Sequence, residues 1–139
     1  MKGYEIFSTT ADVGLKIRGK THETLYENAV KGFFRLVTGQ GVESGCHKTS
    51  GVHHFDFRGD SCENVLVNLL SEIIFLIDSS KSIVTGIDIE HASEKMLRAD
   101  LFVHALQNPP ELDIKSVTYH NLQVMEYGGE KSAAIVFDI

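Results

Sequence analysis

The chain contains few cysteines and fewer cationic than acidic residues. Each of these features argues against certain classes of protein. It has two cysteines, Cys46 and Cys62, and no CxxC pair among its 139 residues. Two isolated cysteines favour a reducing compartment, although one disulfide stays open as an alternative. Lys and Arg number 13 against 19 Asp and Glu, which gives a formal charge of −6. Because phosphate binding needs clustered cations, this balance argues against a broad RNA- or DNA-binding surface. It leaves room for a cationic protein partner or a metal ion.

Long apolar runs and common catalytic motifs are also missing. Residues 1–14 (MKGYEIFSTTADVG) lack the apolar run of a signal peptide, so we expect a cytoplasmic protein. There is no Walker lysine loop, no GxSxG and no HExxH. The cysteines have no zinc-site spacing with a histidine. The adjacent His53 and His54 would point to opposite faces of a strand, so they would not chelate one ion together.

The most strongly patterned stretch is residues 60–78 (DSCENVLVNLLSEIIFLID), which predicts a central helix. Asp60 stands three residues before Glu63, which is the spacing of a capping box. At about 25 cal/mol per Å² of buried apolar area, this helix should make the largest local contribution to the core. The apolar positions recur at spacings of three and four, with polar residues opposite. The apolar residues are Val65, Leu66, Leu69, Leu70, Ile73, Ile74, Leu76 and Ile77, and the polar ones are Asn64, Asn68, Ser71 and Glu72.

The other segments predict a second helix and a set of strands. Thr21 as N-cap and Gly39 as a stop signal favour a helix over residues 21–37. Alternating or β-branched segments predict strands, and glycine, proline and polar residues mark the breaks between them. The predicted strands are residues 2–7, 13–19, 49–58, 83–90, 94–104, 114–126 and 132–139, with a loop at 42–48, turns at 91–93 and 127–130, and an irregular connection at 105–112.

Three strands carry more specific predictions. In the strand 49–58, we expect Val52 to point inward, and with it Phe55 and Phe57. The strand 114–126 is too long for one regular period, which predicts a bend or bulge near Asn121. The strand 132–139 is almost wholly apolar, so we expect it to be central in its sheet. The whole pattern predicts one α+β domain over residues 1–139, with two helices on a largely antiparallel or mixed sheet in the order ββαβαββββ.

Two aspartates stand in unusual surroundings. Asp12 directly precedes the strand 13–19. Asp138 lies at the end of an apolar strand, next to Ile139, the last residue of the sequence. Ionised carboxylates are costly to bury unless they meet a cation or several donors. Carboxylates and carbonyl oxygens suit a hard cation such as Ca²⁺ or Mg²⁺. On these residues alone, two solvated strand ends are the simpler interpretation.

Four motifs together resemble the archease family. They are residues 10–14 (TADVG), 65–78 (VLVNLLSEIIFLID), 114–120 (IKSVTYH) and 137–139 (FDI). They occur in the family's order and span nearly the whole chain. Any one alone would be weak, but their joint presence is specific.

This resemblance implies an accessory protein of the RtcB-type RNA-splicing ligase, and not an enzyme, acting in tRNA splicing, tRNA processing or RNA repair. Archeases promote guanylylation of the ligase's active-site histidine and so support multiple turnover. The family's metal-binding site would fall on Asp12 and Asp138, with Ile139 as a further ligand, around a divalent ion such as Ca²⁺, Mg²⁺ or Mn²⁺. Lys115 and His120 are further candidates for activating the partner. The resemblance implies no direct nucleic-acid binding and no membrane association.

The sequence departs from the family pattern at two places. Thr9 stands where the family commonly has His, and residues 108–113 (NPPELD) replace a more usual His-Glu-Pro-Lys type run. These changes remove an imidazole and a basic side chain but keep the acidic pair. Two alternative functions stay open. One is a metal-dependent phosphoester hydrolase that uses the same acids with His120 or Lys115, and the other is a chaperone-like binding module.

Overall fold

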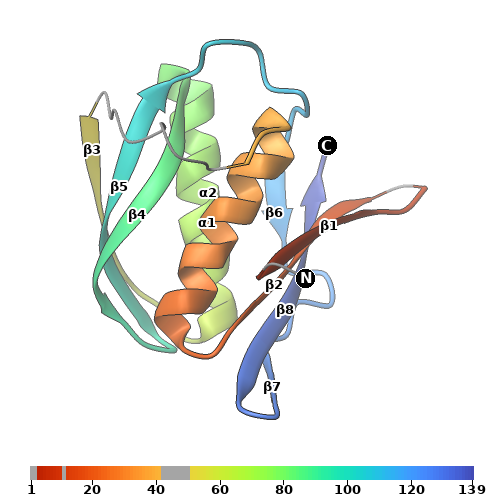
Figure 1. Ribbon diagram of the computed structural model, residues 1–139, viewed down its shortest axis with the longest axis vertical. Coiled ribbons are helices and arrows are strands. Elements are labelled where there is room, and N and C mark those ends of the chain that lie inside the picture. The colour runs from red at the N-terminus through yellow and green to blue at the C-terminus, as the bar shows by residue number, and fades with distance from the viewer. Residues whose placement is uncertain (1–2, 11, 42–50) are drawn as a thin grey trace.

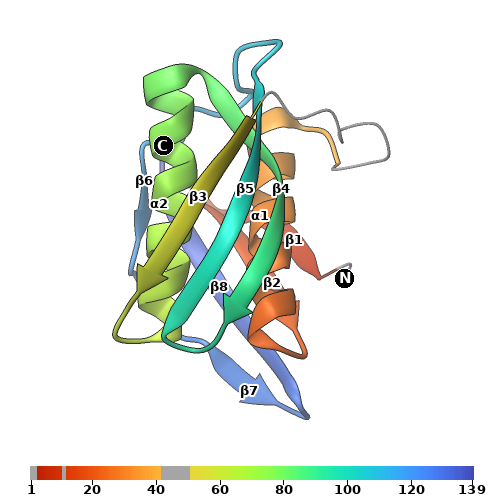
Figure 2. The ribbon, with the colours of Figure 1, turned by 90° about the vertical axis from the view of Figure 1, so that its left-hand side faces the viewer.

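The polypeptide folds into three layers, with two helices between two antiparallel sheets (Figure 1). The computed structural model describes residues 3–10, 12–41 and 51–139. Figure 2 looks onto the smaller sheet, with both helices behind it and the larger sheet behind the helices. The predicted α+β class with two helices and antiparallel strands is confirmed, but the strands form two sheets where the sequence predicted one. Strand pairing is a long-range property, and residue periodicity does not report it.

Both predicted helices are present. α1 covers His22–Thr38, and the side-chain oxygen of Thr21 caps its first turn as predicted. Gly39 ends this helix in the left-handed conformation, with a φ of 75°. α2 covers Cys62–Ser80 and buries its apolar face, while the polar residues predicted on the opposite side are exposed or half-buried.

The start of α2 differs from the prediction. The N-cap is Ser61 and not Asp60, since the Ser61 Oγ accepts a hydrogen bond from the Asn64 N–H at 3.1 Å. The Asp60 N–H donates to the Asn64 Oδ1 at 3.2 Å. Glu63 points elsewhere and accepts from the Val124 N–H at 2.8 Å. The serine one residue later therefore takes the capping role, and the glutamate anchors the segment that follows the predicted bend.

The larger sheet has the order β1-β2-β8-β6, with β7 also paired to β8. Its strands are β1 (Tyr4–Ser8), β2 (Val13–Gly19), β6 (Ser116–Thr118), β7 (Met125–Tyr127) and β8 (Glu130–Asp138). β8 has neighbours on both edges, so its predicted central position is confirmed.

The predicted long strand 114–126 is broken into β6 and β7, which adds one strand to the predicted order. Asn121 has a φ of 53°, and the Leu122 N–H donates to the Tyr119 carbonyl at 3.0 Å. A left-handed residue inside a turn takes the chain out of the sheet. The break predicted near Asn121 is therefore a turn and not a bulge.

The smaller sheet has the order β3-β5-β4. Its strands are β3 (Gly51–Arg58), β4 (Ser82–Ala92) and β5 (Met96–Ala105). The turn predicted at 91–93 is displaced, because β4 continues to Ala92 and the Ser93 N–H donates to the Met96 carbonyl at 2.8 Å. The inward orientation predicted for Val52 is wrong. Its side chain is 50% exposed, because the alternation that buries Phe55 turns Val52 outward.

Fully buried side chains from both sheets and both helices form the core: Leu15, Ile17, Leu25, Leu66, Leu69, Leu97, Leu101 and Ile135. The rings of Phe33 in α1 and Phe137 in β8 pack at a centroid distance of 5.4 Å. Phe137 directly precedes Asp138. The core packing therefore fixes the strand end that carries one of the two aspartates.

Gly14 of the TADVG motif permits a close approach on the outer face of the larger sheet. A Cβ atom there would lie 2.1 Å from the Phe7 Cζ and 2.7 Å from the Ile135 carbonyl oxygen. Phe7 is the cross-strand partner of Gly14, and the Lys16 Nζ lies 5.7 Å from the centre of its ring. The Phe7 ring therefore covers the glycine, which explains why the motif has no side chain at this position.

Some predictions lie outside the described residues. They are the loop 42–48, the first residues of the strands 2–7 and 49–58, and Cys46 with its neighbour His47. Neither helix in the described part of the chain combines the length and the apolar character needed to cross a membrane.

Candidate functional site

The predicted acidic pair lies at one end of the larger sheet, where β2 begins and β8 ends. Val13 pairs with Phe137 across these strands. Asp12 directly precedes Val13 and Asp138 directly follows Phe137, so the two aspartates occupy the next cross-strand position. Side chains at such positions point to the same face, with Cβ atoms about 4.5–5.5 Å apart. Because Phe137 faces the core, both carboxylates lie on the outer face, and both residues are exposed.

Hydrogen bonds from neighbouring strands hold the two aspartates. The Ser116 Oγ donates to the Asp138 Oδ2 at 2.8 Å, and the Lys115 N–H donates to the Asp138 carbonyl at 2.9 Å. On the other side, the Thr9 N–H donates to the Asp12 carbonyl at 2.8 Å, and the Asp12 N–H donates to the Thr9 Oγ1 at 3.1 Å. These bonds leave the Asp12 carboxylate and the Asp138 Oδ1 without a hydrogen-bond or ion-pair partner among the described residues.

The groups at this end of the sheet that could act as metal ligands all bind through oxygen. Carboxylates, hydroxyls and main-chain carbonyls are the ligands that hard divalent cations prefer, whereas Zn²⁺ favours nitrogen and sulfur. The pair therefore fits Ca²⁺, Mg²⁺ or Mn²⁺. Within residues 3–10, 12–41 and 51–139, no group of three or more His, Cys, Asp or Glu could hold a metal ion. A cation here would have two carboxylates, and it would take further ligands from a main-chain oxygen such as that of Ile139, from water or from a partner.

Of the two predicted activation residues, only Lys115 lies at the same end of the larger sheet as the acidic pair. Lys115 is exposed, and its backbone is bonded to Asp138. His120 lies beyond the opposite end of β6, where its Nε2 is 3.2 Å from the Asn121 Nδ2. At about 3.3 Å per residue along an extended chain, Lys115 and His120 lie roughly 15 Å apart. His120 therefore belongs to the turn after β6 and not to the acidic pair.

The adjacent histidines of β3 point to opposite faces, as predicted. The His53 Nε2 faces α2 and lies 3.5 Å from the Glu72 Oε2. His54 contacts Asp100 on the outer face of the smaller sheet. Each imidazole therefore has a single carboxylate partner, and the two histidines do not share a ligand.

Cys62 is the described cysteine, and it is buried and free. Its Sγ lies 3.4 Å from the Tyr26 hydroxyl, which donates to the Ser93 carbonyl at 2.6 Å. Burial raises the pKa of the Cys62 thiol, and burial also raises the pKa of Tyr26. The thiol therefore stays protonated near neutral pH, which makes it a poor nucleophile or metal ligand.

Ser116 is the residue at the acidic pair that the sequence analysis missed. It lies directly after Lys115 in the IKSVTYH motif, so this motif is the feature of the sequence that could have identified Ser116 as a site residue. Its contact with Asp138 depends on the pairing of β6 with β8, in which Ser116 is the direct partner of Asp138. A one-residue slip of that register would turn the hydroxyl to the other face.

These features define a small α+β protein that carries two aspartates at the paired ends of neighbouring strands. The model of the Archease protein family (MTH1598/TM1083) matches residues 4–139, and the chain therefore belongs to this family. Protein archease of Thermoplasma volcanium is 28% identical over 140 residues, which cover 98% of each chain. Protein archease of Methanosarcina barkeri is 26% identical over 145 residues, which cover 99% of this chain and 97% of that protein. The resemblance drawn from the four motifs is confirmed.

Two solved structures share the fold. The solution structure of Methanobacterium thermoautotrophicum protein 1598 has a TM-score of 0.74 at 21% identity, covering 100% of both chains. The crystal structure of a Thermotoga maritima protein, described as an archease and possible chaperone, has a TM-score of 0.65 at 18% identity. It covers 97% of this chain and 96% of that one.

Proposed function

We propose that this chain is an accessory protein of an RtcB-type RNA-splicing ligase. It promotes guanylylation and multiple turnover of the ligase in tRNA splicing or RNA repair, and it is not itself the enzyme. Membership of the archease family supports this proposal. The observation that carries it is the placement of Asp12 and Asp138 side by side on an exposed sheet end, without an ion-pair partner among the described residues.

In this proposal Asp12 and Asp138 hold a divalent ion, with the main-chain oxygen of Ile139 as a further ligand. When bound, such an ion supplies positive charge that offsets the charge of nucleotide phosphates. The chain presents the two carboxylates where a partner can reach them, and Ser116 orients one of them. Lys115 is exposed at the same end of the sheet, and in this proposal its ammonium group contacts an anion on the partner. The charge of −6 suits a ligase that is basic because it binds RNA.

The test is guanylylation of the cognate ligase with radiolabelled GTP and a divalent metal, with and without this protein. We expect a large stimulation that Asp12→Asn or Asp138→Asn abolishes, because each variant removes one of the two carboxylates. The matched control is Asp78→Asn, which removes an exposed aspartate near the end of α2 and should keep full stimulation. Stimulation that survives both site variants would mean that the acidic pair is not used.

Variants of Lys115 and His120 test whether the functional surface lies at the acidic pair or at the turn after β6. Lys115→Ala should lower the stimulation, because the lysine adjoins the acidic pair. His120→Ala should leave it nearly unchanged, because the imidazole lies at the other end of β6. A loss in His120→Ala alone would move the functional surface to the turn after β6.

A chaperone-like function is the second candidate. The Thermotoga protein is described as a possible chaperone, and this chain exposes Met125 and Tyr127 on one strand, at 57% and 89%. That function predicts that the chain slows aggregation of an unrelated unfolded protein, and that Asp12→Asn does not change the effect. Turnover of phosphodiesters by the chain alone would instead support the hydrolase alternative.

A further inference from the structure

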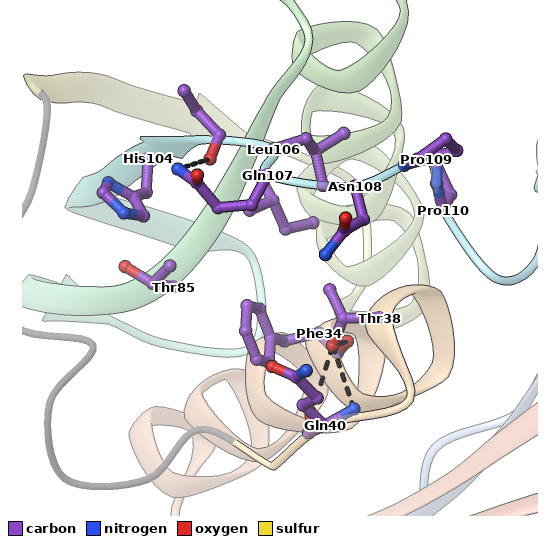
Figure 3. Close-up of a pocket in the computed structure, with 12 residues that line it drawn as sticks. Phe34, Thr38, Gln40, Thr85, His104, Leu106, Gln107, Asn108, Pro109 and Pro110 are labelled. Carbon is purple, nitrogen blue, oxygen red and sulfur yellow. Dashed lines mark hydrogen bonds between the residues drawn. The ribbon is translucent and has the colours of Figure 1, made fainter.

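A pocket of about 240 Å³ lies between the end of α1 and the connection that follows β5 (Figure 3). Phe34 and Thr38 of α1 line one side, and residues 105–110 line the other. Thr85 of β4 is buried on its floor, with 5% exposure. None of these residues belongs to the acidic pair or to its hydrogen bonds.

Backbone hydrogen bonds hold the two sides of the pocket together. The Glu111 N–H donates to the Val37 carbonyl of α1 at 2.9 Å, and the Leu106 N–H donates to the Lys81 carbonyl at 2.9 Å. The connection is thus tied to α1 beyond one end of the pocket and to the end of α2 at the other. A pocket whose walls are already fixed binds a ligand with less loss of conformational entropy.

The described part of the lining carries no formal charge. Acidic and basic residues make up 23% of the chain, but none of the described residues that line this pocket is Asp, Glu, Lys or Arg. Its polar groups are hydroxyls, side-chain amides and the imidazole of His104. Desolvating an ion here would not be repaid by an opposite charge, so the lining favours an uncharged ligand.

Two of the amides stand on opposite sides of the pocket and are free to bind. In Figure 3, Asn108 extends from the connection toward Thr38, and Gln40 lies beside the end of α1. Their side chains have no hydrogen-bond partner in the part of the chain that the structure describes. By contrast, the Gln107 Nε2 donates to the Ala105 carbonyl at 3.4 Å. Each amide offers a donor and an acceptor in one plane, which matches the edge of a nucleobase.

We propose that this pocket binds a nucleobase as an uncharged, flat heterocycle. The base packs against apolar side chains of the lining, among them Pro109 and Pro110, and its polar edges bond to Gln40 and Asn108. Aromatic and apolar side chains are common stacking partners for unpaired bases. This inference concerns a different surface from the acidic pair, and it stands or falls independently of the proposed ligase partner.

The experiment is a titration of the ¹⁵N-labelled full chain with each of the four common nucleosides, followed by heteronuclear NMR. Ribose and benzyl alcohol are the controls for the sugar and for a flat apolar ring. We expect at least one nucleoside to shift the side-chain amide signals of Gln40 and Asn108 and the backbone signal of Thr85. The matching nucleoside monophosphate should bind no more tightly, because the lining offers no cation to a phosphate.

Three variants decide whether the amides recognise the base. Gln40→Ala and Asn108→Ala should each weaken binding about two- to tenfold, as for the loss of one net hydrogen bond. Gln123→Ala removes an exposed glutamine outside the pocket and should leave the affinity unchanged. Absence of shifts with all four nucleosides would overturn the proposal. So would a benzyl alcohol response of equal size that neither pocket variant changes, because the pocket would then be only an apolar cavity.

Discussion

The outer faces of the two sheets both carry charged side chains, but the acids on them differ in whether they have partners of opposite charge. On the smaller sheet, acids have partners of opposite charge or an imidazole across strands: the Arg98 Nε lies 3.2 Å from the Asp56 Oδ2, and His54 contacts Asp100. Asp100 is also the cross-strand neighbour of Asp88. At the end of the larger sheet, Asp12 and Asp138 are neighbours of like charge, and neither forms an ion pair among the described residues. The inner faces do not differ in this way, because both pack apolar side chains on the helices.

The comparison shows which charges point to a function. Ion pairs across strands add modestly to the stability of a sheet, whereas like charges directly opposite each other reduce it. A local arrangement that opposes stability is expected mainly at functional sites. Asp88 and Asp100 of the smaller sheet are also like charges opposite each other, but Asp100 contacts His54. The acidic pair of the larger sheet is the better candidate site, because neither of its aspartates has an ion-pair partner among the described residues.

The largest effect should come from the inner face. Phe137 is 1% exposed and packs on Phe33, so Phe137→Ala should lower the free energy of unfolding by about 3–5 kcal/mol. Phe102 is half-buried on the outer face of the smaller sheet, and Phe102→Ala should cost less than about 1.5 kcal/mol. Urea unfolding followed by circular dichroism measures both. Equal losses would mean that the outer face of the smaller sheet is covered by something that contributes to the core.

Glycines provide the next test, because both sheets have glycines on their strands. Gly14→Ala should destabilise the protein by about 1–3 kcal/mol, since the new Cβ would meet the Phe7 ring and the Ile135 carbonyl. In β3, the one contact that a Cβ at Gly51 would make with the described residues is to the Val103 Cγ2, at an ordinary 3.6 Å. Gly51→Ala should therefore change the stability by less than about 0.5 kcal/mol in the same unfolding measurement. A tolerant Gly14 would show that Phe7 can leave the outer face without loss.

Local sequence patterns predicted the helices well but could not predict strand pairing. The cap at Thr21 and the stop at Gly39 depend on a few adjacent residues, and both are confirmed. The division into two sheets depends on which distant strands hydrogen-bond, and periodicity contains no such information. Val52 was misplaced for a related reason: Val52 and Phe55 differ by three positions, so a strand cannot bury both.

The sequence likewise predicted one part of the candidate site and not the rest. Asp12 and Asp138 stand out in the sequence as acids at the ends of apolar strands, and the family motifs made them specific. The neighbourhood of these acids was out of reach, because Ser116 and Lys115 come near Asp138 only through the pairing of β6 with β8. His120 shares a motif with Lys115, but strand β6 lies between the two and places them at its opposite ends.

Neutralising single aspartates should shift stability in opposite directions on the two sheets. Asp12→Asn removes one of two like charges and should raise the free energy of unfolding by about 0.2–1 kcal/mol. Asp56→Asn removes the partner of Arg98 and should lower it by up to about 1 kcal/mol. Both changes should shrink in about 1 M NaCl, because salt screens exposed charges. A loss of stability in Asp12→Asn would mean that its carboxylate has a stabilising partner in solution.

The smallest expected effect is a pH dependence at His22, the first residue of α1. Burial, and then the charge of Lys131 in β8, lower the pKa of His22, while Glu94 in the β4–β5 turn acts against them. The folded state therefore favours the neutral imidazole, and the unfolded chain takes up a proton first as the pH falls. The stability contributed by neutral His22 is present at higher pH, begins to fall as the pH drops through about 6.5, and levels off below the folded pKa.

His22→Gln should remove this loss in unfolding measurements between about pH 7.5 and pH 6. Lys131→Met should reduce the loss and Glu94→Gln should increase it, because the two charges act on His22 in opposite directions. If neither variant changed the loss, the shift would come from burial alone, and the charges of the two sheets would not act on this histidine.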